Sequence, residues 1–429
     1  MGGEITPPGD KSICHRALIL NSLAEGAAKI SNPSPGEDCR ATISCLKALG
    51  TKIQKGKPLP SPTLLISGTG RLGLREADNV LDARNSATTM RLLSGLLSAQ
   101  PFLSITSGDA SLRSRPMKRL IEPLRLMGAE IWGRGQDSFA PLVIRGKQVH
   151  GIDYSLPVPS AQIKSAILLA GLFAQGKTAI YQTTPSRNHT ELMLREMGAE
   201  LETDGNWISL APLSAPLAPI DFHIPGDISS AAYWLAAAAI HPNARVKIMN
   251  CGINPTRTGI IDVLLAMGAK LKLENQRLEG NEPVADLLIE SSELKGIEIA
   301  GDIIPRLIDE IPVLAVAGCV ARGNTTIRGA GELRVKESDR IANVVKELSK
   351  LGARIEELPD GMVIHGGKLL RGTDVDSHLD HRLAASLAIA GLVAKGETIV
   401  HHAQVVKVSY PTFWEELEML TGYQPEEKF

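Results

Sequence analysis

The chain has 429 residues, 43% hydrophobic and 22% charged, so it can bury sizeable cores and does not have the composition of a disordered protein. Its formal net charge is −1 and only 3% of its residues are aromatic, which argues against nucleic acid or an anionic membrane as partner. The five cysteines form no C-x-x-C pair, which argues against a disulfide framework and against a metal site.

One phrase recurs along the chain and predicts internal repeats. Its copies are LKALGTKI from Leu46, LRLMGAEI from Leu124, LREMGAEL from Leu194, LLAMGAKL from Leu264 and LSKLGARI from Leu348, with a weaker LEMLTGY near the C-terminus. Each copy reads as the last turn of an amphipathic helix, a glycine in the left-handed conformation, and the start of a strand. The clear copies begin 70 to 84 residues apart, so each repeat is a substantial subdomain.

A second phrase precedes most copies: an Ala- and Leu-rich helix, a small turn and a β-branched strand, as in LLAGLFAQGKTAI and LAVAGCVARGNTTI. Each unit therefore reads as strand, helix, strand, helix, strand, and six units predict two α/β domains of three. This pattern fits helices that pack together beneath outer sheets, and it also fits a doubly wound sheet.

Polar and charged residues gather where the Ala- and Leu-rich helices are expected to begin. A helix N-terminus attracts anions, and a basic side chain in its first turn adds charged hydrogen bonds. Taken singly, no segment is decisive, because helix capping or a solvated charge pair also explains several of them. Together they predict that basic residues, opposed by few carboxylates, converge on small anionic substrates between two closing domains. In chain order the segments are PPGDKSICHR, LDARNSATTMR, DASLRSRPMKR, PVPSAQIKSA, PSRNHTE, IPRLIDEIPVLAVAG, LRVKESDRIANV and LDHRLAASLAIAG.

Seven of the chain's motifs resemble, in order and over nearly its whole length, those of the 5-enolpyruvylshikimate-3-phosphate synthases: PGDKSICHR, NSATTMR, SRPM, PSAQIKSA, PGDISSA, RVKESDR and DHRLAAS. The resemblance implies an α/β fold of two domains, each of three βαβαββ repeats, the inside-out α/β barrel of enolpyruvyl transferases. It places one domain at 14–225 and the other at 1–13 plus 226–429, with the active site in the cleft between them.

The resemblance also implies an activity: transfer of the enolpyruvyl group of phosphoenolpyruvate to the 5-hydroxyl of shikimate 3-phosphate, with release of phosphate and without metal or organic cofactor. Asp309 would be the base on that hydroxyl, and Glu337 with Lys11 would move protons at the enol methylene carbon. The shikimate 3-phosphate contacts would be Lys11, Ser12, Arg16, Ser160, Ala161, Gln162, Arg187, Asp309 and Lys336. The phosphoenolpyruvate contacts would be Lys11, Asn85, Ala87, Arg115, Gln162, Arg340 and Arg382.

The chain departs from the family pattern at three positions. Ala87 replaces a glycine of many members, which predicts the glyphosate-insensitive class. Val408 stands where some members have lysine, and Lys407 one position earlier is not expected to substitute, because neighbouring residues of a strand face opposite ways. Cys14 replaces a common serine and is expected to be a small buried side chain rather than a reactive thiol.

Two other functions compete with this interpretation. One is the sister enolpyruvyl transferase that acts on UDP-N-acetylglucosamine, and the other is a non-catalytic anion-binding repeat protein. The K-S-x-x-H-R and D-H-R motifs favour the shikimate enzyme, and Asp309 and Glu337 favour catalysis. The N-terminus has no secretory signal and the apolar runs are too short to span a membrane, so we expect a cytoplasmic protein. Its two internal domains lead us to expect a monomer.

Overall fold

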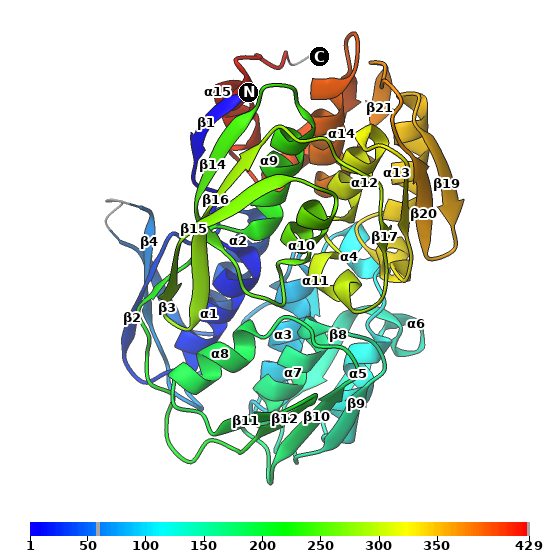
Figure 1. The fold of residues 1–429 in the computed structure, drawn as a ribbon. Helices are drawn as coiled ribbons and strands as arrows, with labels where there is room; N and C mark the ends of the chain where they lie inside the picture. The colour runs from blue at the N-terminus through cyan, green and yellow to red at the C-terminus, as the bar shows by residue number, and fades with distance from the viewer. Residues whose placement is uncertain (57–60, 427–429) are drawn as a thin grey trace. The chain divides into compact units, whose positions relative to one another are not determined.

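The computed structural model describes residues 1–56 and 61–426, which form two compact units (Figure 1). The N-terminal unit contains Gly9–Ile224 and Glu279–Glu282, and the C-terminal unit contains Met1–Pro8, Pro225–Leu278 and Pro283–Phe429. The first boundary thus lies after Pro8, five residues before the one that the family resemblance implied. The reason is local: Asp10 already caps helix α1 (Lys11–Leu23), accepting a hydrogen bond from Ile13 N at 2.9 Å, so the turn before the helix packs with it.

Three four-stranded sheets surround the N-terminal unit, and each has one parallel edge pair followed by antiparallel strands. In spatial order the first sheet is β13 (Phe222–His223), β2 (Ala27–Ser31), β4 (Thr63–Ser67) and β3 (Lys52–Lys55). The second is β5 (Leu81–Asp82), β6 (Leu103–Ser107), β8 (Phe139–Arg145) and β7 (Glu130–Gly133). The third is β9 (Asp153–Leu156), β10 (Thr178–Gln182), β12 (Trp207–Leu210) and β11 (Leu201–Asp204).

The central helices of this unit are α1, α3 (Ala87–Leu97) and α7 (Ala161–Gly171), and after their first turns nearly every residue is buried. Their residues are buried on all sides because helices or sheets cover every face. Helices α3 and α7 approach closely at Gly95, where an added Cβ would lie 2.1 Å from the carbonyl oxygen of Ala166. The remaining helices are α2 (Glu37–Ala48), α4 (Ala110–Ser114), α5 (Lys118–Leu126), α6 (Arg134–Asp137) and α8 (His189–Glu196).

The C-terminal unit repeats this plan with two four-stranded sheets and one two-stranded sheet. The first sheet is β1 (Gly2–Ile5), β14 (Arg245–Gly252), β16 (Glu282–Glu290) and β15 (Lys270–Glu279), so the N-terminal strand completes a sheet of the C-terminal half. The second is β17 (Glu298–Ile299), β18 (Asn324–Ile327), β20 (Gly361–His365) and β19 (Arg354–Leu358), and the third is β21 (Asp374–Asp376) with β22 (Ile399–His401).

Its central helices α9 (Ile228–Ile240), α12 (Ile311–Val320) and α14 (His381–Val393) pack against one another (Figure 1). All of α9 is buried. The other helical segments are α10 (Gly259–Ala266), η1 (Gly301–Ile303), α11 (Ile304–Leu307), η2 (Gly331–Val335), α13 (Arg340–Lys350), η3 (Ala403–Val408) and α15 (Phe413–Thr421). Within residues 1–56 and 61–426, no helix combines the length and hydropathy that crossing a membrane requires.

The internal repeats that the sequence predicts are confirmed. In all six copies the glycine follows the second helix of a repeat and has a positive φ between 71° and 96°. The last repeat is shortened: the described residues after β22 contain η3 and α15 but no closing hairpin. Aromatic residues fill this place, since Trp234 of α9 stacks on Phe413 at a centroid distance of 5.1 Å and donates to Tyr410 Oη at 2.7 Å. The sheets lie outside and the apolar helices inside, so the doubly wound alternative is wrong.

Candidate active site

The central helices begin with polar caps in both units. Asp10, Ser86 and Ser160 cap α1, α3 and α7, and Asp227 and Asp380 cap α9 and α14, each side chain accepting a hydrogen bond from a backbone N–H of the first turn. Such caps satisfy backbone donors that would otherwise have no partner. The side chains beside these caps are the candidate site residues.

In the N-terminal unit, α1 contributes Lys11, Ser12 and Arg16. Arg16 is 3% exposed, and its guanidinium donates to the Ser12 carbonyl at 2.9 Å, to Ser165 Oγ at 2.8 Å and to Thr190 Oγ1 at 2.6 Å. Arg187, in the loop before α8, donates to Ser12 Oγ at 3.3 Å. The starts of α1, α7 and α8 are thus joined within the N-terminal unit.

Lys11 is paired in this structure. Its Nζ lies 2.8 Å from Asp38 Oδ2 of α2, with the two side chains 19% and 12% exposed. The carboxylate holds the ammonium group at the start of α1.

The starts of α3 and α7 share a second network. Gln162 donates to Thr88 Oγ1 at 2.8 Å and accepts from Arg91 at 2.5 Å, while Arg115 donates to Asn85 Oδ1 at 2.6 Å. Ala87 is the first residue of α3 and is 8% exposed. Ser160 and Ala161 are half-buried at the start of α7, where the Ser160 hydroxyl accepts from Ile163 N.

Lys164 of α7 is buried and fixes the loop that carries Arg187. Its Nζ lies 2.6 Å from Glu191 Oε1 and 3.1 Å from the carbonyl oxygen of Ser186. Burial lowers the pKa of Lys164 and the carboxylate of Glu191 opposes that shift. The ammonium group therefore joins α7, α8 and the loop between β10 and α8.

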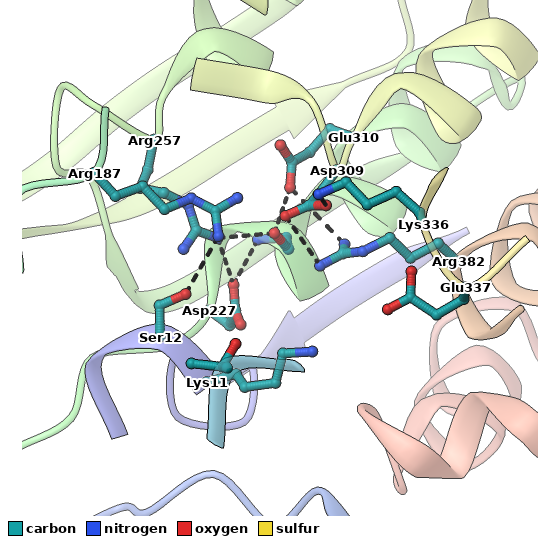
Figure 2. Close-up of polar contacts among 12 residues, drawn as sticks. Lys11, Ser12, Arg187, Asp227, Arg257, Asp309, Glu310, Lys336, Glu337 and Arg382 are labelled. Atoms are coloured by element: carbon teal, nitrogen blue, oxygen red, sulfur yellow. Dashed lines mark hydrogen bonds and ion pairs between the residues drawn. The ribbon is translucent and has the colours of Figure 1, made fainter. Parts of the chain in front are cut away.

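In the C-terminal unit, Asp309 faces three cationic side chains, of which Figure 2 labels Lys336 and Arg382. Its carboxylate lies 3.4 Å from Arg340, 3.7 Å from Arg382 and 3.8 Å from Lys336. Asp309 immediately precedes Glu310, the N-cap residue of α12. Three positive charges around one carboxylate at a helix start can receive anionic substrate groups.

Arg340 is 1% exposed and is surrounded by carboxylates. It lies 2.7 Å from Asp380 and 2.6 Å from Glu337. Burial opposes its charge, yet these two carboxylates hold the pKa of Arg340 above its ordinary value. Burial likewise acts to raise the pKa of Asp380, but Arg340 holds it below the ordinary value.

The expectation of few carboxylates is therefore wrong for the C-terminal unit. Each predicted cation there has an acidic neighbour, because an unpaired charge buried at a helix start would be costly. The acidic members are Asp227, Asp309, Glu310, Glu337 and Asp380.

Comparison with known proteins assigns the chain to a family. The family model described as EPSP synthase (3-phosphoshikimate 1-carboxyvinyltransferase) matches residues 1–417. A 3-phosphoshikimate 1-carboxyvinyltransferase from Herpetosiphon aurantiacus is 52% identical over 415 residues, 96% of this chain and 95% of that protein. Its counterpart from Gloeobacter violaceus is 52% identical over 418 residues, 97% of this chain and 96% of that protein.

The chain belongs to the EPSP synthase family. A solved EPSP synthase from Acinetobacter baumannii superposes with a TM-score of 0.86 at 43% identity, covering 98% of this chain and 95% of that one. The chain is thus a carboxyvinyltransferase of the shikimate pathway that moves the enolpyruvyl group to shikimate 3-phosphate, as its motifs predicted.

The segment near the C-terminus is not the strand that the sequence analysis assumed. Lys407 and Val408 belong to the 3₁₀ helix η3, so the alternation of side chains along a strand does not apply to them. The Lys407 side chain is exposed and Val408 is half-buried. Cys14 is 0% exposed, and its burial agrees with the expected small core side chain.

Sequence reasoning missed several polar residues at the helix starts. Arg257, which precedes α10, is 2% exposed and bonds Asp227 and Ser229. The repeat could have identified Arg257 as a candidate, since Arg257 stands two residues before α10 just as Arg187 stands two residues before α8. Arg91 lies within the motif NSATTMR, but its partner Gln162 is 71 residues away, and Asp38 had no such signal because Lys11 is 27 residues away.

Proposed function

We propose that the reaction proceeds by addition and then elimination through a tetrahedral intermediate, with Asp309 as the base. The acceptor's 5-hydroxyl gives its proton to Asp309 as its oxygen bonds C2 of phosphoenolpyruvate, and the methylene carbon gains a proton. The new methyl group then loses a proton as the C2–O bond to phosphate breaks. The observation that carries this proposal is the Asp309 carboxylate with three cationic side chains within 3.8 Å.

Glu337 and Lys11 transfer the protons at the methylene carbon in this proposal. Both are half-buried titratable groups held beside opposite charges, Glu337 by Arg340 and Lys11 by Asp38. A positioned acid or base contributes about 10²–10⁴-fold to such a step.

The anionic groups of the substrates take over the charged hydrogen bonds that side chains now make to one another. Guanidinium forks match carboxylate and phosphate groups, and exchanging protein carboxylates for substrate anions keeps the charge balanced. The proposed ligands of shikimate 3-phosphate are Lys11, Ser12, Arg16, Ser160, Ala161, Gln162, Arg187, Asp309 and Lys336. Those of phosphoenolpyruvate are Lys11, Asn85, Ala87, Arg115, Gln162, Arg340 and Arg382.

Since these ligands come from both units, the proposal requires the two units to bind one pair of substrates in a shared cleft and to close on it. Closure excludes water from a reactive intermediate.

We further propose a monomer in a reducing cytoplasm, which suits five free, buried cysteines. X-ray scattering by the 45.8 kDa chain would give a monomer mass and a smaller radius of gyration with both substrates. A dimer mass would contradict the proposed monomer. A radius of gyration unchanged by substrates would contradict the proposed closure.

The acceptor is tested by mass spectrometry of the product. We expect phosphoenolpyruvate with shikimate 3-phosphate to give the enolpyruvyl ether, and phosphoenolpyruvate with UDP-N-acetylglucosamine to give no product. A product from the nucleotide sugar alone would replace this function by that of the sister transferase.

Ala87 supports a further proposal, that the enzyme belongs to the glyphosate-insensitive class. Its methyl group lies at the start of α3, beside Asn85, which Arg115 contacts at 2.6 Å. One methyl group in a tight site changes binding by about 1–3 kcal/mol, or roughly 10–200-fold. We therefore expect Ala87→Gly to lower the inhibition constant of glyphosate at least about tenfold.

Ala99→Gly is the matched control, because Ala99 has the same 8% exposure and lies beyond the other end of α3. Inhibition constants measured against phosphoenolpyruvate decide the question. Micromolar inhibition of the unmodified enzyme, or equal constants for both variants, would refute the assignment to this class.

A further inference from the structure

Two of the places where the chain passes between units, after Pro8 and after Ile224, carry the same motif. Pro8–Ser12 reads PGDKS and Pro225–Ser229 reads PGDIS, and the two segments begin α1 and α9. In each, the aspartate caps its helix: Asp10 accepts from Ile13 N at 2.9 Å and Asp227 from Ser229 N at 2.8 Å. The sequence therefore contains this helix start twice.

Each copy also has an arginine that reaches its serine. Arg187 donates to Ser12 Oγ at 3.3 Å and Arg257 donates to Ser229 Oγ at 2.8 Å. Both arginines stand two residues before the second helix of a repeat, α8 and α10 respectively. The two constellations therefore match in residue type and in contact.

They differ in charge and exposure. The position of Lys11 is taken by Ile228 in the second copy, so one cation is lost there. Arg257 is 2% exposed and lies 3.1 Å from Asp227 Oδ1, whereas Arg187 is half-buried. The second copy thus has one buried guanidinium balanced by a carboxylate, which does not suit an incoming phosphate.

A chain of polar contacts leads from Arg257 to Asp309 within the C-terminal unit (Figure 2). Ser229 donates its hydroxyl hydrogen to Glu310 Oε1, because Arg257 donates to the serine oxygen. Glu310 Oε1 lies 4.0 Å from Arg382 Nη1, and Arg382 Nη2 lies 3.7 Å from Asp309 Oδ2. Glu310 is 1% exposed, so its charge interacts strongly with neighbouring side chains.

We infer that Arg257 is a positioning residue that sets the placement of Arg382 beside Asp309 through Ser229 and Glu310. This inference rests on the roles proposed above for Asp309 and Arg382. Without Arg257, the Ser229 hydroxyl is free to turn to Asp227, and Glu310 loses the hydrogen bond from Ser229. The Glu310 carboxylate then attracts Arg382, which moves away from Asp309 and from the anion that it binds.

The first test is a double-mutant cycle between Arg257→Met and Glu310→Gln. Arg257→Met is expected to lower kcat and to raise KM for phosphoenolpyruvate, with kcat/KM falling about tenfold or more. In the Glu310→Gln background the same change is expected to cost less than about threefold, because the charge that competes for Arg382 is gone. Arg257→Lys should recover part of the loss, since it keeps the charge and one hydrogen bond.

Arg322→Met is the matched control, because Arg322 is 74% exposed and pairs only at the surface with Glu293. If Arg257→Met does not fold, Ser229→Ala gives the same test with a smaller change. We expect Ser229→Ala to reduce kcat/KM for phosphoenolpyruvate, while Ser230→Ala, one residue along the same helix, leaves it unchanged.

Equal losses for Arg257→Met with and without Glu310→Gln would overturn the inference, because Arg257 would then act directly on substrate or on the fold. So would an unchanged kcat/KM in Ser229→Ala. Failure of the proposed roles is distinguishable: it appears as an Asp309→Asn enzyme that stays active, whatever the cycle gives.

Discussion

Replacing Asp309 by Asn is expected to lower kcat by about 10²–10⁴-fold, the usual contribution of a positioned general base. The amide keeps the size of the side chain and can still accept a hydrogen bond from Arg340, so shape is preserved while the proton acceptor is lost. Because three cations lose one counter-charge, binding of the anionic substrates should be retained or strengthened. The variant should therefore show a fall in kcat without a rise in either KM.

Asp374→Asn provides the control, since Asp374 lies in the same unit and its side chain is 66% exposed. Steady-state kinetics with each substrate varied in turn would measure both constants. An Asp309→Asn enzyme with kcat within about threefold of the parent would remove Asp309 from the role of base.

Replacing Lys11 by Met should have the second large effect, because Lys11 is proposed to contact both substrates and to take part in proton transfer. Losing one charge-stabilising donor costs about 10²–10³-fold in rate. We expect kcat to fall by about that factor and KM for both substrates to rise.

Part of the Lys11→Met effect could come from Asp38, whose carboxylate lies 2.8 Å from Lys11 and would lose its partner. Asp38→Asn separates the two causes, because it keeps Lys11 and removes the opposite charge. Lys29→Met, on the exposed face of β2, controls for the loss of a lysine in the same unit. Equal kinetics of Lys11→Met and Lys29→Met would contradict the assignment.

The fold was largely predictable because its information is local and repeated. A glycine at the end of an amphipathic helix predicts a left-handed residue and a strand, and six such signals occur in the chain. Helices such as Ile228–Ile240 are apolar on every face, which indicates the centre of a domain. The membership of the N-terminal strand in the C-terminal half, where β1 pairs with β14, was implied by the family resemblance, and the strand order was not predicted.

The candidate site was predictable in its cations and less so in its charge balance. Lys11, Arg16 and Arg340 stand at helix starts, where a sequence pattern exposes them. The carboxylates that pair with them have no such pattern, because Asp38 is 27 residues from Lys11 and Asp380 is 40 residues from Arg340 along the chain. Partners that meet only through tertiary packing leave no periodic signal, so carboxylates beside the cations were underestimated.

The most direct test of the account is phosphate release by the purified protein, with phosphoenolpyruvate and shikimate 3-phosphate supplied separately and together. We predict release only when both are present, and loss of that release in Asp309→Ala and Lys11→Ala proteins that retain the thermal unfolding midpoint of the parent. Release from phosphoenolpyruvate alone, or release undiminished in both folded variants, would contradict enolpyruvyl transfer by the residues assigned to it.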